Sequence, residues 1–555
     1  MPNTHLPHVS NGTNFPLSRA FGLAASLALG LAASAPATAQ ESWRAFDVPA
    51  LSLKCPSPAA IARLDRGYHV HFESDELELL ERRSPVFLPL GDLLSLLSSE
   101  AARAKTPLRF MPGSTPLLAR GGTEALAATE ATLADLSAFA AALEVEVRAW
   151  WLPGAPAQPV RPDDATARQL IAAAKPLGVA RVRSGSSVDL GQRRERSFVA
   201  GFWVEVASDS NAPDPWIGRV LTGRTLHLDV ARARGGRAVH VDALLDLAEE
   251  TAQVEFDPDT LDLGIVQQPV VEALQLGFSG TVDSGGWLAV SVEGRAPFEG
   301  VLLLQLATTA DPATPARWRA FDLALANATP QRRPAPLPWE DERDSDYGSE
   351  GREKLDAAAF AQVADEASRA GESRLSSLKG RDARSGPQWS EGLLLVPTGD
   401  GEALTELGTL IAALERSRSA GREFDVQHGS VHVRGPLGEG GSLRVLSVTE
   451  TTVLVDQDVE VAEKSWTPSP RIERMLAGFS VEGQLESGGL AVRGWSSERA
   501  PNTRVERHAA GLAALELFDR GLRSGSARIE GGSARELIEA SGSRPALRVG
   551  LTPAK

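Results

Sequence analysis

The sequence contains one cysteine, Cys55, among 555 residues. A single cysteine excludes an intramolecular disulfide, so the fold must be stabilised by hydrophobic cores rather than by cross-links. A chain of this length can bury several such cores. Cys55 lies too far beyond the N-terminal apolar segment to be a lipid-attachment residue, and we expect it to be a partly buried free thiol.

Positive charge is also scarce, since acidic residues outnumber basic ones and the formal net charge is −15. No basic stripe with interleaved aromatic residues occurs, which disfavours a nucleic-acid partner. After residue 39 no apolar run is long enough to cross a bilayer as a helix. We therefore expect a protein without a transmembrane helix, soluble or peripherally attached to the envelope.

Motifs of the common catalytic sites are missing. No glycine-rich phosphate loop ends in Lys-Ser or Lys-Thr. The segment GFSVEG (478–483) is no nucleophile elbow, because a valine and a glutamate follow its serine. The segment SSLK (376–379) fits a Ser-x-x-Lys pattern but lacks the companion motifs of that chemistry. We name no catalytic residue, no cofactor and no metal site from the sequence.

Histidines with metal-ligand spacing have a simpler explanation. His69 and His71 alternate on a predicted strand and would need an acid such as Glu73 to complete a site. We expect ordinary exposed strand histidines rather than a metal site. His428 and His432 are four residues apart, but the intervening glycine and the alternating pattern predict a strand or turn. The helical zinc geometry therefore fails.

Two acidic segments fail as calcium loops. In DPDTLDLG (257–264) Leu261 stands at the fifth ligand position and Gln268 at the twelfth. The segment at 341–350 also fails the loop spacing and is typical of a solvated linker. The pair Trp150-Trp151 is a possible binding platform, although one ring in the core and one at its rim is the expected arrangement.

The N-terminus resembles a secretory signal. Arg19 precedes the apolar run at 21–34, and small residues lead to Ala39. We expect cleavage after Ala39 and export to the periplasm or beyond the cell.

One phrase of the chain is written twice. VEVASDSNAPDPWIGRVLTG (204–223) and VEVAEKSWTPSPRIERMLAG (459–478) match at 11 of 20 positions. The shared residues are mostly apolar, proline or glycine, which indicates that the phrase has a structural role rather than a catalytic or binding one. Pro-x-Pro excludes a central strand. Ile217 and Leu221 predict a short helical turn that Gly223 ends.

The repeat extends upstream of this phrase. Helices predicted at 128–143 and 405–418 space their apolar residues at three and four, and an alternating strand follows each, at 144–150 and 422–433. The first copy holds an insertion at 163–185 that predicts a helix and then a strand. We therefore expect an α+β fold, mainly β, with two diverged tandem copies behind an N-terminal domain. The expected divisions are a signal peptide (1–39), an N-terminal α+β domain (40–114), a first repeat module (115–327), a proline-rich and acidic linker (328–354) and a second repeat module (355–555).

The segments 393–426 and 116–151 share an apolar strand, a glycine-rich turn, a helix and a second strand. This layout resembles the ring-building domains of bacterial secretins. The resemblance implies an exported assembly or scaffold protein, and it brings no catalytic residues. The chain departs from that family because only short strands precede its end at 545–555, so we expect no membrane pore.

Two functions from different classes follow. The first is a non-catalytic envelope scaffold that uses its strand edges for contact with other proteins or with itself. The second is an exported hydrolase or carbohydrate-binding protein whose site lies between the two repeat modules. Acids and tryptophans gathered in a cleft between the halves would favour the second function.

Overall fold

The computed structural model of the chain is built mainly of β-strands, which confirms the expectation of a mainly β protein with a few helices. Within the described residues no helix is both long and apolar enough to cross a membrane. The structure describes residues 42–46, 93–94, 97–98, 108–111, 117–207, 210–233, 236–256, 266–308, 318–322, 325, 388–390, 393–397, 405, 408–409, 412, 421–438, 441–462, 465–486, 489–499, 504–506, 515–517, 520–542 and 544–553.

A small unit near the N-terminus combines three strands and a helix. β1 (Ser42–Phe46) and β2 (Leu108–Phe110) both pair antiparallel with β3 (Leu117–Gly121). Helix α3 (Thr123–Ala142) confirms the predicted helix, and its leucines pack against this sheet. The sheet joins strands from both sides of the boundary expected after residue 114.

Short strands also occur later in the chain. β12 (Trp318–Asp322) and β13 (Gln388–Ser390) both pair antiparallel with β14 (Leu393–Pro397), so β14 is the central strand of this second small sheet. β20 (Arg504–Glu506) and β21 (Leu515–Leu517) form a separate two-stranded sheet.

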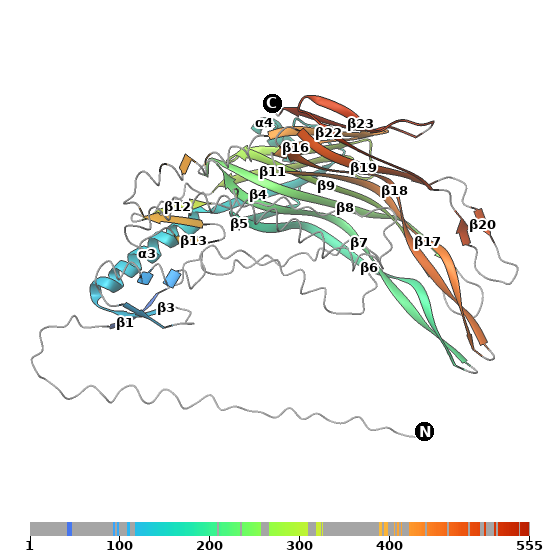
Figure 1. Cartoon of the computed structure of the whole chain (residues 1–555), viewed down its shortest axis with the longest axis horizontal. Coiled ribbons are helices and arrows are strands. Elements are labelled where there is room, and N and C mark those ends of the chain that lie inside the picture. The colour runs from blue at the N-terminus through green and yellow to red at the C-terminus, as the bar shows by residue number, and fades with distance from the viewer. Residues whose placement is uncertain are drawn as a thin grey trace, which may run out of the picture.

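Two eight-stranded antiparallel sheets, here sheet I and sheet II, make up most of the fold (Figure 1). Sheet I has the order β23-β24-β15-β16-β10-β11-β4-β5. Its strands, in that order, are Ser533–Ile538, Leu547–Pro553, Gly421–His428, Val431–Gly438, Trp287–Glu293, Gly300–Thr308, Glu144–Pro153 and Gly178–Arg183.

Sheet II has the order β22-β19-β18-β17-β9-β8-β7-β6. Its strands, in that order, are Arg520–Ile529, Gly489–Arg499, Ser465–Glu486, Ser442–Ala462, Val266–Asp283, Ala238–Phe256, Ser210–Ala233 and Ser186–Ala207. Several of these strands are much longer than the usual five or six residues.

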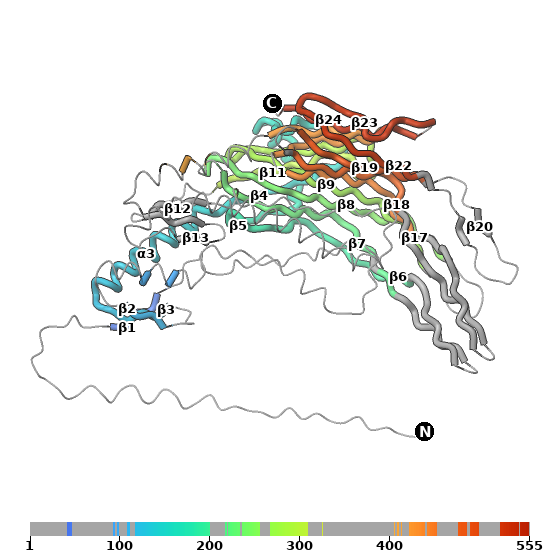
Figure 2. The backbone as a smooth tube through the Cα atoms, viewed as in Figure 1, coloured from blue at the N-terminus to red at the C-terminus, as the bar shows by residue number. Residues whose placement is uncertain are grey.

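Both sheets contribute to one hydrophobic core. Alternate residues of a strand point to the same face, and in β8 the inward-facing Val239, Val241 and Leu245 are fully buried. Phe278 of sheet II and Phe424 of sheet I belong to the same cluster. The strands at the ends of the two sheets are consecutive in the sequence. The chain passes from β5 of sheet I into β6 of sheet II, and from β22 of sheet II into β23 of sheet I. Figure 2 shows the layered strands, with α3 at one end of the molecule.

The insertion expected at 163–185 is confirmed as a helix followed by a strand. Helix α4 (Asp164–Ile171) begins after Asp163, whose Oδ1 accepts a hydrogen bond from the Thr166 amide at 2.8 Å. This contact satisfies one of the amides that a helix leaves unpaired at its start. β5 follows the helix and ends sheet I.

The repeated phrase lies in two long hairpins, β6–β7 and β17–β18. The helical turn expected at Ile217 and Leu221 is wrong, because both residues lie in β7 and pair with β6. The hairpin gives the described residues of the phrase cross-strand partners, whereas an isolated helical turn closes a single hydrogen bond. β7 pairs with β8 only from Gly223 onward, so Pro213 and Pro215 pair with β6 alone among the described strands. The prediction that this segment is not a central strand is confirmed.

Candidate functional site

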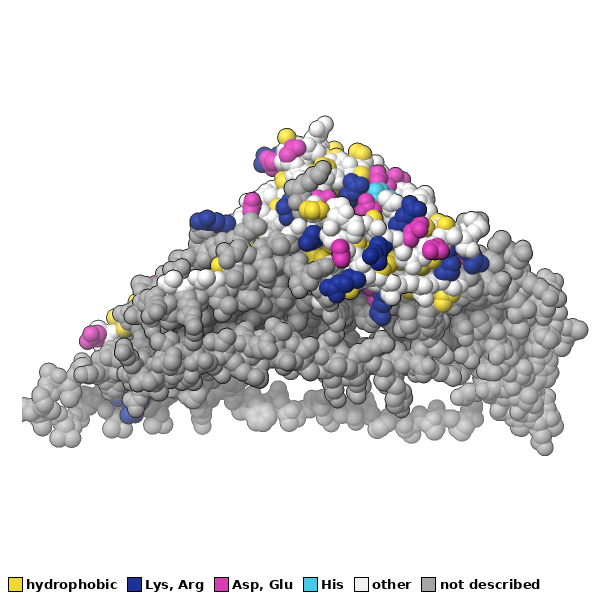
Figure 3. Space-filling model, turned by 45° about the horizontal axis from the view of Figure 1, so that its top comes forward, with side chains coloured by type: hydrophobic (Ala, Val, Ile, Leu, Met, Phe, Trp, Pro, Cys, Tyr) yellow, Lys and Arg dark blue, Asp and Glu magenta, His cyan; other side chains and the backbone are white. Residues whose placement is uncertain are grey.

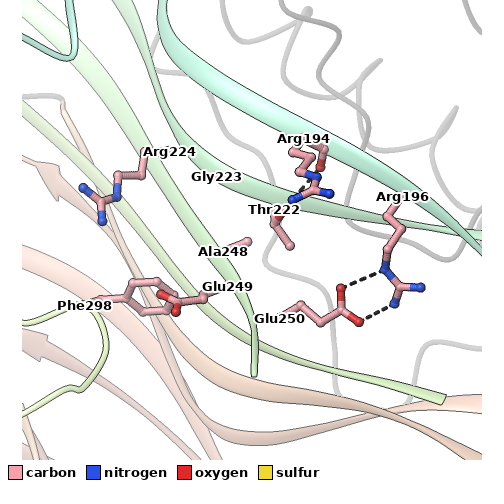
Figure 4. Close-up of a pocket in the computed structure, with 9 residues that line it drawn as sticks. All are labelled: Arg194, Arg196, Thr222, Gly223, Arg224, Ala248, Glu249, Glu250 and Phe298. Carbon is pink, nitrogen blue, oxygen red and sulfur yellow. Dashed lines mark hydrogen bonds and ion pairs between the residues drawn. The ribbon is translucent and has the colours of Figure 1, made fainter. Parts of the chain in front are cut away.

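One pocket opens where β6, β7 and β8 pass the turn between β10 and β11 (Figure 4). Its volume is about 400 Å³. All of its lining residues belong to the first half of the chain. They are Arg194, Arg196, Thr222, Gly223, Arg224, Ala248, Glu249, Glu250 and Phe298.

Charge dominates this pocket, and part of it is already paired. The guanidinium of Arg196 donates from Nε to Glu250 Oε2 at 2.9 Å and from Nη2 to Oε1. Thr222 donates through Oγ1 to the Arg194 carbonyl at 3.4 Å. The lining holds no histidine or cysteine. The polar contacts of this pocket therefore include an ion pair and a hydroxyl-to-carbonyl hydrogen bond.

A second candidate site is the seam, which we define as the contact of β9 with β17 in sheet II and of β10 with β16 in sheet I. Arg295, in the turn between β10 and β11, reaches sheet II, where its Nη2 ion-pairs with Glu272 of β9 and donates to the Val448 carbonyl of β17 at 3.1 Å. Thr449 donates to Glu272 Oε1 at 2.8 Å. Arg295 and Glu272 are each 17% exposed, so these contacts bind the two halves in a largely dry place.

The sheet I side of the seam is also polar. His432 lies between two carboxylates, with Nδ1 3.1 Å from Glu293 Oε2 and Nε2 2.9 Å from Asp425 Oδ1. Glu293 and His432 are direct cross-strand partners of β10 and β16. No group of three or more His, Cys, Asp or Glu that could hold a metal ion occurs among the described residues. The geometry is that of an imidazole hydrogen-bonded between two carboxylates.

His428 lies at the end of β15, and His432 follows in β16. This confirms the strand or turn expected for the pair. The His428 ring stacks on Phe479 with centroids 4.6 Å apart, and Nε2 lies 3.2 Å from Ser496 Oγ. Burial, with a smaller contribution from the positive charge of Arg523, lowers the pKa of His428 to about 4.

Stability is expected to fall as the pH is lowered from about 6.5 to about 4, because His428 is neutral in the folded chain. The unfolded imidazole takes up a proton near its ordinary pKa of 6.5, whereas the folded one does so only near 4. Within this window the unfolded state binds the extra proton, so acid favours unfolding. Urea midpoints measured across the window should fall less for His428→Gln than for the parent chain. Equal falls in both proteins would contradict this assignment.

Charges of both signs lie on the face of the molecule drawn in Figure 3. Figure 3 shows Lys and Arg side chains interspersed with Asp and Glu over the described face of the molecule. Cross-strand pairs such as Arg493 with Glu482 and Arg548 with Glu536 account for part of this mixture. In such pairs the charges of opposite sign partly neutralise each other.

Trp150 and Trp151 point to opposite faces of β4, and both are 6% exposed. Trp151 belongs to the core between the sheets. Trp150 packs on Trp287 with ring centroids 5.6 Å apart, and Trp287 donates through Nε1 to Asp164. Both rings are therefore packing residues rather than an exposed platform.

The segment GFSVEG (478–483) lies within β18. Several other sequence expectations fall outside the described residues. Outside the described residues lie the expected signal (1–39), Cys55, His69, His71, Glu73, the segments 257–264, 328–354 and 376–379, and most of the helix predicted at 405–418.

A second repeated phrase was missed by the sequence reasoning. The letters WRAFD occur at 43–47 and again at 318–322; β1 holds the first four letters of the first copy, and β12 holds all five of the second. Trp43 pairs with Arg120 of β3, and Trp318 pairs with Pro397 of β14. A direct comparison of the chain with itself would have found this match, because five identical consecutive residues are rare by chance.

The seam residues carried no such signal. Glu272, Glu293, Thr449 and His432 stand in different strands, and only the pairing of the sheets brings them together. No family model, curated protein or solved structure matches the chain.

Proposed function

We propose that the chain is an exported, non-catalytic scaffold protein made of two tandem copies of one unit, which assembles through the edges of its sheets. The order of the strands carries this proposal. From β6, sheet II continues as β6-β7-β8-β9 and then β17-β18-β19-β22. From β5, sheet I continues as β5-β4-β11-β10 and then β16-β15-β24-β23. Eight strands in chain order thus occupy the same relative places in each half.

Cross-strand register supports the same proposal. Val204 pairs with Pro213 in the first hairpin, and Val459 pairs with Pro468 in the second. The first hairpin has a register shift between Val199 and Gly201, and the second has one at the matching place, between Leu454 and Asp456. A bulge at matching positions of two hairpins is expected of related units rather than of chance.

Glycine positions agree with this register. Gly223 and Gly478 both have positive φ, of 123° and 140°. A side chain at Gly223 would meet the Gln192 carbonyl, and one at Gly478 would meet the Ser447 carbonyl. Gln192 and Ser447 are separated by the same 255 residues as the two glycines. The small sheets β1-β3-β2 and β12-β14-β13, each with the letters WRAF in its first strand, extend the likeness upstream.

Assembly follows from the way the two halves meet. They join strand to strand in both sheets, through β9–β17 and β10–β16. Among the described strands, β6 and β22 end sheet II and β5 and β23 end sheet I, and a unit that continues a sheet internally can also add a strand at such ends. The expected signal and the resemblance to secretin ring-building domains favour an exported scaffold. The described pocket lies within the first half, so it does not favour a catalytic site between the halves.

Light scattering tests this function. The full-length chain, expressed with its own N-terminal segment and purified from the exported fraction, is expected to elute as an assembly of two or more copies. The fraction of assembly should rise with concentration, because association is a mass-action equilibrium. A monomer over the whole accessible concentration range would contradict the proposal.

A further inference from the structure

We infer that copies of this chain associate head to tail, with β22 of one copy pairing antiparallel with β6 of the next. β22 and β6 are the two terminal strands of sheet II. The inference rests on the proposed function, and it names the partner of those edges as a second copy of this chain. In sheet I the terminal strands are β23, which follows β22 in the sequence, and β5, which precedes β6. In the same contact, β23 of one copy would therefore meet β5 of the next.

The seam provides the template for this contact. β22 holds in the second half the place that β9 holds in the first, and β6 holds the place of β17. The β9–β17 ladder inside the chain is therefore the internal version of a β22–β6 ladder between chains. A contact that already forms within the chain has a geometry that these strands can adopt.

The pairing register follows from the chain's own ladders. Gly223 pairs with Ala248 and Ala248 with Ala273 in the first half. In the second half Gly478 pairs with Ser497 and Ser497 with Leu522. Leu522 is therefore the counterpart of Ala273.

The partner strand is placed in the same way. Val448 pairs with Ala273 across the seam, and Val448 has Arg193 as its counterpart in the first hairpin, 255 residues earlier. Leu522 of one copy is thus expected opposite Arg193 of the next. Antiparallel pairing then sets Arg523 opposite Gln192 and Ser526 opposite Asp189.

This register keeps the two faces of the sheet separate. It places Ala527 opposite Val188 and Gly525 opposite Leu190. Val188 and Leu190 belong to the core between the sheets, and Ala527 packs against that core. A shift by one residue would set inward-facing residues against outward-facing ones, so the match of faces is an independent check on the register.

Charge and exposed apolar surface are compatible with the contact. From Leu522 to Ala527 no two like charges stand opposite each other in this register. The terminal strands also expose apolar side chains, since Leu522 of β22 is 40% exposed and Val179 of β5 is 54% exposed. Because the contact joins two different edges, it repeats from copy to copy and closes into a ring or continues as a filament.

Disulfide trapping tests the contact with two single-cysteine chains, each also carrying Cys55→Ser. One chain carries Gln192→Cys and the other carries Arg523→Cys. Mixed and mildly oxidised, they are expected to form a disulfide-linked pair at least about tenfold more than either chain alone, because only opposed residues come within bridging distance. The matched control pairs Gln192→Cys with Arg528→Cys, which is displaced by about 17 Å along the strand and should not cross-link.

Each outcome decides the inference. Strong linkage of either chain with itself would show a symmetric contact and overturn it. An assembly seen by light scattering, with no linkage above the control, would also overturn it while leaving the proposed function in place. A monomer would overturn both. Circular dichroism of each variant, compared with the parent chain, verifies that the cysteines leave the sheets folded.

Discussion

Replacing Gly478 with alanine is expected to lower the free energy of unfolding by about 3 kcal/mol, because backbone strain and a steric clash add together. Gly478 has a φ of 140°. A Cβ built there would lie 2.1 Å from the Ser447 carbonyl oxygen and 2.8 Å from Val448 Cα. Both atoms belong to the backbone of β17, so neither can move without breaking the ladder. Urea denaturation followed by tryptophan fluorescence measures the change.

Gly285 supplies the matched control for this substitution. It also has a positive φ, of 86°, but a Cβ there would meet nothing within 4 Å. Gly285→Ala should therefore cost only the left-handed conformation, about 1 kcal/mol. Gly223→Ala should behave like Gly478→Ala if the two hairpins are equivalent. Equal small losses at Gly478 and Gly285 would contradict the predicted clash.

Replacing Phe424 with alanine is expected to lower the free energy of unfolding by about 4 kcal/mol, because it leaves a cavity in the core between the sheets. Phe424 is fully buried in β15. Its ring occupies the space above Gly435 of β16, where a Cβ would lie 2.8 Å from the ring. The loss of stability has two parts: the hydrophobic free energy gained by burying the ring, and the van der Waals contacts that neighbouring residues lose around the cavity.

Gly435 makes this prediction sharper. Gly435→Ala alone should destabilise the protein, since the new methyl group meets the ring of Phe424 and lies 3.2 Å from Val290. In the Phe424→Ala background the same methyl group should cost much less or stabilise, because it enters the vacated space. A double-mutant cycle measures this coupling. Additive losses would contradict the packing of ring against glycine.

Local pattern was enough to predict several elements. The spacing of leucines at three and four predicts α3, because a helix brings such residues to one side. Polar capping and alternation predict α4 and β5 in the insertion. Alternating runs such as EVEVRAW (144–150) predict a mainly β fold. Each of these signals acts within a few residues of the chain.

The rest depended on contacts between distant residues. Ile217 and Leu221 fit a helical turn by spacing, but pairing with β6 decides their conformation. Glu293 and His432 are opposite one another across the seam, although 139 residues separate them. Nothing in the local sequence of β10 specifies β16 as its neighbour. The pairing depends on register, twist and burial of the whole sheet, which single-residue preferences do not encode.

The prolines of the two hairpins have a consequence for misassembly. Pro213 and Pro215 in β7, like Pro468 and Pro470 in β18, lie where each strand extends past its second neighbour. A proline offers no amide hydrogen to an incoming strand, so these protruding segments are poor templates for amyloid-like growth or domain swapping. The terminal strands β5, β6, β22 and β23 contain no proline. The prolines thereby oppose strand addition at the hairpins, whereas the strands at the ends of the two described sheets carry no such block.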